Sequence, residues 1–298
     1  MKIAIAGGSG FIGKHLADAL LKEGHEVFIL TRSRKNSSNG IQYVQWMSEG
    51  TSPESELKDT DVFINLAGKS INTRWTEQAK KEIIDSRVKA ARETGRILSV
   101  LESKPATLIN ASAVGAYGAD VTQSFTEDSP VADEDFLSHT VRIWEEEAKN
   151  AAAPGMRTVL CRFGIILDQH DGALPPMLLP YKLFAGGTVG SGEQWLSWIH
   201  IQDVVKLILF VIQEESIEGP VNFTSPNPVQ MKEFGKTIAK VTGKPHWLPA
   251  PSFAINTLMG EMSDLILKGQ RVLPKKALEH GYSFHFPDLE HSLKNIIK

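Results

Sequence analysis

The sequence predicts a doubly wound α/β fold, in which a parallel sheet carries helices on both faces, with a second, smaller C-terminal α/β domain. Short apolar segments alternate with helical segments through the first 165 residues, and strands that alternate with helices form parallel sheets. A glycine-rich turn follows the first apolar segment. Beyond residue 165 the chain is interrupted by proline and glycine more often, which indicates a change of domain.

The first strand–turn–helix unit predicts a dinucleotide site. Residues 2–6 form an apolar strand, and residues 11–22 have helical periodicity. In such a unit Gly7 permits the tight turn, Gly10 lets the backbone approach a pyrophosphate, and Gly13 lets helix and strand pack closely. The pyrophosphate would lie at the helix N-terminus; the alternative is a glycine-rich turn without a ligand. The expected cofactor contacts here are Gly7, Ser9, Gly10, Phe11, Ile12 and Gly13.

The end of the second strand, residues 27–30, indicates which dinucleotide binds. A site for NAD usually places a carboxylate about 20 residues after the glycines, to accept from the ribose hydroxyl. Thr31 stands at the strand end instead, and Arg32, Arg34 and Lys35 follow it. Arginine pairs well with phosphate, so we expect NADP, with Thr31, Arg32 and Arg34 as contacts. The alternative is a solvated basic loop.

The alternation of strands and helices continues beyond these residues. We expect further strands at residues 41–46, 61–65, 106–110 and 156–161, and helices at residues 76–102 and 136–153. This order is typical of the Rossmann arrangement, whose ligands bind beyond the carboxyl ends of the strands. One edge of the sheet should therefore gather residues 7–13, Arg32, the Leu66–Ala67–Gly68 segment, residues 112–118 and residues 163–165, including Ile165.

The predicted domains are an NADP-binding domain at residues 1–165, to which later segments can return, and a smaller substrate-side domain at residues 166–298. Within the second domain, residues 168–180 contain Gly172 and a Pro-Pro pair and are predicted to be a loop. A strand is expected at residues 195–200. The expected helices cover residues 204–212, 253–268 and 274–280, and His200 and Asp203 resemble a cap for the first of them.

Composition narrows the class of protein. The 298 residues carry a net charge of −3, which argues against a nucleic-acid partner. No apolar run approaches the roughly 18 residues of a membrane helix, so no membrane partner is expected. The single cysteine, Cys161, suits a reducing compartment and a cytoplasmic location. The nine histidines show no metal-ligand spacing, so we expect no metal.

Several motifs resemble those of the extended short-chain dehydrogenase/reductases, a superfamily that includes sugar-nucleotide epimerases and dehydratases. These motifs are the glycine turn, Asn-Leu-Ala-Gly at residues 65–68, and Ser-Trp-Ile-His-Ile-Gln-Asp at residues 197–203. More narrowly, the chain resembles an atypical branch of epimerase-family or cell-division-inhibitor-like proteins, whose own C-terminal domain corresponds to residues 245–298. That narrower resemblance is carried by residues 74–75, 86–87, 112–118, 144–145, 162–164, 269–274 and 281–284.

The resemblance implies cofactor contacts from the helix that follows residue 68. In that branch this helix faces the cofactor, which makes Glu82 and Arg87 candidate contacts. The alternative for both is an ordinary charged helix surface.

The catalytic residues of the superfamily are absent from the sequence. Members with established chemistry use a tyrosine and a lysine four residues later. None of the four tyrosines has a lysine at that distance: Tyr43, Tyr117, Tyr181 and Tyr282 are followed by Met47, Val121, Ala185 and Phe286. If Trp-Glu at residues 144–145 marks the catalytic helix, Leu137 and Val141 occupy the two places.

Ser112 and Tyr117 are the candidate replacements, because both can relay a proton and both follow the predicted strand at residues 106–110. The alternative is that Tyr117 packs against its turn. The sequence therefore leaves two functions open. One is an NADP(H)-binding oxidoreductase or sugar-nucleotide-epimerase-like enzyme acting on a small polar substrate. The other is a catalytically weak or inactive NADP(H)-bound regulatory or binding protein, linked to cell division or redox sensing.

Overall fold

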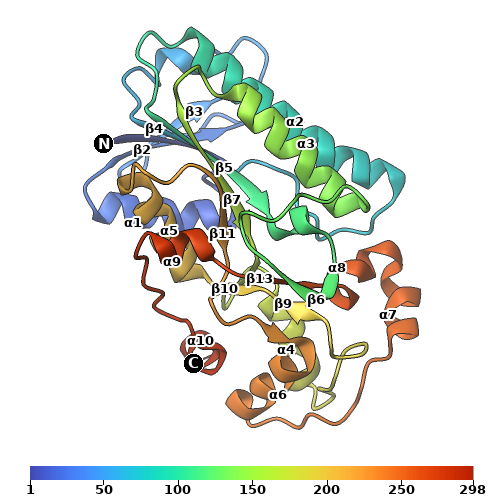
Figure 1. Ribbon diagram of the computed structural model, residues 1–298. Helices are drawn as coiled ribbons and strands as arrows, with labels where there is room; N and C mark the ends of the chain where they lie inside the picture. Colours follow the sequence, from blue (N-terminus) through green and yellow to red (C-terminus); the bar gives the residue numbers. More distant parts are fainter. Residues whose placement is uncertain (298) are drawn as a thin grey trace.

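The computed structural model describes residues 1–297 and is built around one parallel sheet of seven strands (Figure 1). Every neighbouring pair in this sheet is parallel. The predicted doubly wound α/β class is therefore confirmed. In spatial order the strands are β11 (Gly219–Phe223), β7 (Arg157–Phe163), β5 (Thr107–Ala113), β4 (Val62–Asn65), β1 (Lys2–Ala6), β2 (Glu26–Thr31) and β3 (Ile41–Gln45).

Helices cover both faces of this sheet, which explains why its strands are apolar without alternation. In β1, Ile3 and Ile5 belong to the hydrophobic cluster of α1 (Phe11–Lys22) and α5 (Ile201–Gln213). Ala4 and Ala6 point to the other face and join the cluster of α2 (Glu77–Val100) and α3 (Phe136–Ala151). In Figure 1, α2 and α3 lie side by side over one face, and α1 and α5 lie over the other.

The two helices of the second face begin with side-chain caps. Thr76 accepts a hydrogen bond from the amide of Ala79 at the start of α2. Asp135 and Ser138 form a reciprocal capping box at the start of α3. Such caps satisfy amides that have no partner within the helix. The capped start of α3 lies beside the pocket described below.

A smaller α/β unit lies beyond the carboxyl ends of the sheet strands (Figure 1). Its hydrophobic cluster includes Trp198, Phe234 and Leu293. Its strands are β8 (Ile165–Leu167), β9 (Trp195–Leu196), β10 (Trp198–His200) and β12 (Val229–Gln230). Its helices are α4 (Leu174–Lys182), α6 (Met231–Thr242), α7 (Ser252–Met259), the short η3 (Gly260–Ser263), α8 (Asp264–Leu267) and α10 (Leu289–Ile296). No helix within residues 1–297 is long and apolar enough to cross a membrane.

Two segments from beyond residue 165 pack against the part of the molecule formed by residues 1–165. Strand β11, from beyond residue 165, completes the edge of the central sheet. Strand β13 (Gln270–Val272) pairs with β6 (Asp120–Phe125), and α9 (Lys275–Glu279) then packs near β11. The C-terminal segment therefore lies across both parts of the molecule.

The structure differs from the sequence prediction in the segment 168–180, because residues 174–180 belong to α4 and only residues 168–173 form a loop. Pro175 and Pro176 lie in the first turn of this helix, where a missing amide hydrogen leaves no bond unmade. His200 and Asp203, which were both expected to cap α5, have different roles. His200 caps α5 by accepting from the amide of Gln202 at 3.0 Å, whereas Asp203 accepts from the amides of His285 and Phe286, each at 2.8 Å.

Candidate dinucleotide site and adjoining pocket

The glycine turn after β1 is built so that two of its glycines admit no side chain. Gly7 has a φ of +77°, and a Cβ atom there would lie 2.8 Å from the carbonyl oxygen of Leu66. A Cβ atom on Gly13 would lie 2.5 Å from the Cα atom of Gly8. The turn therefore packs directly against the end of β4 and against its own helix, as the sequence predicts.

Gly10 is different, because it is exposed and a side chain there would have only one close neighbour. Apart from its chain neighbours, a Cβ atom there would meet only the carbonyl oxygen of Gly7, at 3.2 Å. Gly10 is the N-cap of α1 and provides no side-chain cap, so the first amides of the helix at Phe11, Ile12 and Gly13 stay available. Ser9 and Gly10 are exposed. These features fit a dinucleotide pyrophosphate, which binds uncapped amides at a helix N-terminus.

The end of β2 presents cations on an ordered loop. Thr31 is buried and donates a hydrogen bond to the carbonyl oxygen of Ser33 at 2.7 Å. The carbonyl oxygen of Arg32 accepts from the side chains of Gln45 and Ser48. The side chains of Arg32 and Arg34 are exposed, and no ion pair within residues 1–297 engages them. The cations predicted to receive a 2′-phosphate are therefore available to do so.

The next two strand ends are held together by a buried amide pair. The side chain of Asn65 donates to that of Asn110 at 2.7 Å, between β4 and β5. The Oδ1 atom of Asn65 also accepts from the amide of Ala67 at 3.1 Å. This fixes the Leu66–Ala67–Gly68 segment beside Gly7, at the edge where the sequence places it.

Arg87 and Glu82, both on α2, have different surroundings. The Nη1 atom of Arg87 donates to the carbonyl oxygens of Lys69 and Ile83, and its guanidinium lies 4.7 Å from the centroid of the Trp144 ring. Burial lowers the pKa of Arg87 to about 10. Glu82 forms an ion pair with Lys69, which lowers the pKa of Glu82. Arg87 thus remains a half-buried cation beside the Gly68 backbone, whereas Glu82 is already paired.

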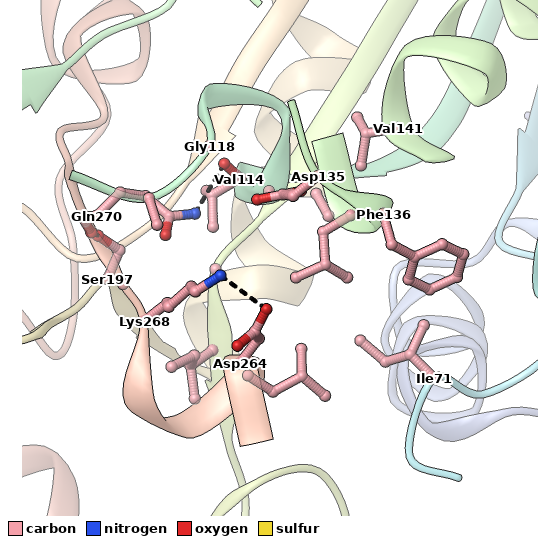
Figure 2. Close-up of a pocket in the computed structure, with 18 of the residues that line it drawn as sticks. Ile71, Val114, Gly118, Asp135, Phe136, Val141, Ser197, Asp264, Lys268 and Gln270 are labelled. Atoms are coloured by element: carbon pink, nitrogen blue, oxygen red, sulfur yellow. Dashed lines mark hydrogen bonds and ion pairs between the residues drawn. The ribbon is translucent and has the colours of Figure 1, made fainter. Parts of the chain in front are cut away.

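A pocket of about 360 Å³ opens between the ends of β5 and β7 and the short helices η3 and α8 (Figure 2). Gly164 and the predicted cofactor contact Ile165 line it. Its polar lining consists of Lys80, Asp135, Ser197, Glu261, Asp264, Lys268 and Gln270. Most of its wall is apolar and includes Trp75, Val114, Phe136, Leu137, Val141, Phe163 and Trp195.

Leu137 and Val141 are both part of this wall, one helical turn apart on α3. Ala113, at the end of β5, lines the pocket near them. A Cβ atom on Gly115 would lie 3.4 Å from Leu137, so the turn after β5 packs closely against this part of α3. The positions at which the resemblance requires a tyrosine and a lysine therefore face the pocket with groups that cannot ionise.

Ser112 and Tyr117 do not line this pocket. Both are buried in a network with the ion pair of Arg162 and Glu145. Ser112 donates to Glu145 at 2.6 Å. The hydroxyl of Tyr117 donates to Asn222 at 2.7 Å and accepts from Arg162 at 2.9 Å. Burial raises the pKa of Tyr117. A catalytic role for Ser112 and Tyr117 remains a prediction.

The fold thus gathers the predicted glycine turn, Arg32, the Leu66–Gly68 segment, Arg87 and Ile165 along the strand ends. Sequence reasoning missed part of the pocket wall, namely Ile71, Lys80, Ala119, Asp135, Phe136, Glu261, Asp264, Leu265 and Lys268. The wall combines the start of α3 with η3 and α8, which are far apart in the chain, and a single side chain such as Phe136 or Leu265 carries no local signal. Other wall residues, such as Trp75, Ala113, Phe163, Ser197 and Gln270, lie in motifs on which the resemblance rests.

The glycine turn of residues 7–13, with the uncapped start of α1, forms a cradle at the end of β1. This cradle and the fold define an NAD(P)-binding protein. The chain belongs to the NAD dependent epimerase/dehydratase family, whose model matches residues 3–223, and residues 250–296 match a domain of unknown function, DUF1731. It is 53% identical to the epimerase family protein YfhF of Bacillus subtilis, over 100% of this chain and 98% of that protein.

Two solved structures extend the comparison. The human epimerase family protein SDR39U1, solved with NADPH, is 31% identical with a TM-score of 0.89, and 99% of each chain is covered. A UDP-glucuronic acid 4-epimerase of Bacillus cereus, solved with UDP-glucuronic acid and NAD, is 17% identical with a TM-score of 0.77, over 99% of this chain and 98% of that one. The second likeness concerns the fold alone.

Proposed function

We propose that the protein binds NADP(H) in the cradle of the glycine turn and acts as an oxidoreductase on a small molecule held in the adjoining pocket. The observation that carries this proposal is the position of the pocket. It is lined by Gly164 and by Ile165, a predicted cofactor contact, and by residues of η3 and α8 from the C-terminal unit. A protein that only stored a dinucleotide would have no need for a second, apolar chamber beside it.

The preference for NADP(H) rests on the basic loop after β2. Arg32 and Arg34 have no carboxylate partner within the described chain, and Thr31 stands where a carboxylate would repel a 2′-phosphate. The solved human relative with NADPH supports the same preference. Arg87 would add a donor to a ribose or phosphate oxygen, because two of its contacts are neutral carbonyls and none is a carboxylate.

The bound cofactor would supply or accept a hydride. The residues of the chain exclude water and orient the substrate, since Ala113, Leu137 and Val141 form an apolar wall at this place. None of the three can donate a proton. Any proton would then come from water or from the rim of the pocket, where Lys268 and Asp135 lie. We assign Ser112 and Tyr117 to positioning, because their hydroxyls bond to Glu145 and Asn222 in the buried network.

The test is to purify the protein, load it with NADPH and measure oxidation of the cofactor against a panel of carbonyl compounds and sugar nucleotides. Turnover by the wild type that is lost in Val141→Glu would support hydride transfer in this pocket. Val100→Glu, at an exposed position at the end of α2 that does not line the pocket, serves as the matched control. Tight NADPH binding without turnover of any panel member would contradict the enzymatic proposal.

A second candidate is a catalytically weak NADP(H)-bound regulatory protein, and the apolar residues Leu137 and Val141 are the observation that favours it. This candidate predicts that NADPH binding changes the surface of η3 and α8, which cover the pocket. Hydrogen exchange of residues 260–268 with and without NADPH would measure that change. We also propose a cytoplasmic location, supported by the single cysteine of the sequence.

A further inference from the structure

The pocket has three positively polarised features that could attract a phosphate group. Two are the ammonium groups of Lys80 and Lys268, which both line the pocket. The third is the N-terminus of α3, where the helix begins at Phe136. Cations and helix N-termini are the usual binding partners of phosphate. A nucleoside diphosphate would require at least one of these features to be free.

Each of the three features is already neutralised by a carboxylate of the chain. Lys80 forms ion pairs with Glu261 of η3 and with Glu77. Lys268 pairs with Asp264 at 2.8 Å, as Figure 2 shows. At the start of α3, the Oδ1 atom of Asp135 accepts from the amide of Ser138, also at 2.8 Å.

The balance of charge around the pocket also disfavours an anion. Within the described chain the lining contains two lysines and three carboxylates, and it contains no arginine. The ion pairs raise the pKa of both Lys80 and Lys268, so both stay charged and paired at neutral pH. A diphosphate entering the pocket would have to displace Glu261 or Asp264 from its partner and would then face the released carboxylate.

The remainder of the wall favours an uncharged, apolar ligand. Trp75, Phe136, Leu137, Phe163 and Trp195 all contribute apolar surface. Burying a methylene group against such a surface is worth a factor of about four in affinity.

We infer that the substrate of this pocket is a phosphate-free, uncharged carbonyl compound with an apolar body, and that nucleoside diphosphate sugars are excluded by the three internal carboxylates. This inference rests on the proposed function, because it names the substrate class of the same pocket. It departs from the small polar substrate, including nucleotide-linked ones, that the sequence resemblance implies.

The experiment measures ligand binding rather than turnover, so that it does not depend on hydride transfer. Trp75 and Trp195 line the pocket, and quenching of tryptophan fluorescence reports its occupancy in the protein loaded with NADP⁺, which cannot transfer a hydride to a ketone. The probes are straight-chain 2-ketones from 2-butanone to 2-octanone, and UDP-glucuronic acid. We expect the dissociation constant of the ketones to fall about fourfold for each added methylene, and no saturable binding of UDP-glucuronic acid at millimolar concentration.

A double variant tests the cause of the exclusion. Glu261→Gln with Asp264→Asn releases Lys268 and leaves Lys80 paired only with the exposed Glu77. This variant should bind UDP-glucuronic acid at least tenfold more tightly than the wild type does. Glu49→Gln, an exposed carboxylate remote from the pocket, is the matched control and should leave both probes unaffected. The ketone series measured on the double variant shows whether its pocket is still formed.

The outcomes separate this inference from the proposed function. Saturable binding of UDP-glucuronic acid to the wild type, a ketone series that does not depend on chain length, or a double variant with an intact pocket and no gain for UDP-glucuronic acid would each overturn the inference. Weak NADPH binding, measured in a separate titration, would count against the proposed function instead, and the probes can then be titrated into the protein alone.

Discussion

Glu145 of α3 and Arg162 of β7 form a buried ion pair with two hydrogen bonds of 2.8 Å, and each side chain is only 4% exposed. Burial opposes the charge of Arg162, but its bonds to Glu145 outweigh that effect and raise the pKa of the guanidinium. Ser112 donates a hydrogen bond to Glu145, and the hydroxyl of Tyr117 accepts one from Arg162. The pair therefore joins α3, β5, β7 and the turn after β5 behind the wall of the pocket.

Removing one partner of this pair should be strongly destabilising. We expect Glu145→Gln to lower the free energy of unfolding by about 3–5 kcal/mol, because Arg162 would be left buried without its counter-charge. Glu146→Gln, at the exposed neighbouring position of the same helix, should change it by less than about 0.5 kcal/mol. Urea denaturation of both variants measures the difference, and equal stabilities would show that the pair contributes nothing.

Tyr117 should affect stability more than chemistry. Its hydroxyl links Arg162 to Asn222, so Tyr117→Phe should cost about 1–3 kcal/mol by leaving buried groups unpaired. Burial raises the pKa of Tyr117 above its ordinary value of 10.0, so a tyrosinate-dependent rate would increase only at alkaline pH. We expect the pH–rate profile of Tyr117→Phe to keep the shape of the wild-type profile. Loss of an alkaline increase in the variant would instead assign Tyr117 a catalytic role.

The two ends of the glycine turn should respond in opposite ways to substitution. Gly10→Val should abolish NADPH binding with little loss of stability, since its Cβ atom meets only the carbonyl oxygen of Gly7 and its side chain would project where the pyrophosphate is expected. Gly13→Val should impair folding itself, because its Cβ atom would lie 2.5 Å from the Gly8 backbone. Thermal unfolding and NADPH titration distinguish the two effects. A folded Gly10→Val protein that binds NADPH tightly would refute the cradle.

His200 should make the protein sensitive to acid. Burial lowers its pKa from 6.5 to about 4, although Asp203 and Asp168 oppose this shift. The unfolded chain therefore binds a proton between pH 6.5 and 4 that the folded protein does not, so stability is complete above pH 6.5 and decreases as the pH falls. The loss attributable to His200 should reach about 3 kcal/mol near pH 4.

The variant His200→Gln should have a shallower decrease of unfolding free energy over this range. His170→Gln serves as the control, because His170 is exposed. Equal pH dependence of the wild type and His200→Gln would contradict the assignment of this loss to His200.

The central sheet could be predicted from the sequence because its strands carry local signals. Strands β1, β2, β4, β5 and β7 are largely apolar runs bounded by polar or glycine-rich segments and are buried on both faces, whereas the edge strand β3 is only partly buried. Strand β11 was missed, since it begins with Gly219 and Pro220, which indicate a turn. Its place in the sheet depends on pairing with β7. The prolines of α4 led to the prediction of a loop. Proline fits the first turn of a helix, and the sequence alone does not show where this helix begins.

The dinucleotide cradle and the adjoining pocket also differ in how far local sequence patterns predict them. The cradle is local, since its glycines, its helix and its basic loop lie within the first 34 residues, and their spacing was sufficient to predict it. The pocket depends on tertiary contacts between α2, α3 and the helices η3 and α8. Ion pairs such as that of Lys80 with Glu261 cannot be predicted from residues almost two hundred positions apart.

The central claim is that the basic loop after β2 selects NADP(H) in a functioning dinucleotide site. Titration of the wild type and of Arg32→Ala with NADPH and with NADH, followed by cofactor fluorescence, tests it most directly. The wild type should bind NADPH about tenfold to a hundredfold more tightly than NADH, because a charged hydrogen bond is worth about 1.5–3 kcal/mol. Arg32→Ala should lose most of that preference, whereas Arg142→Ala, an exposed arginine on α3, should retain it. Equal affinity of the wild type for NADPH and NADH would contradict the account.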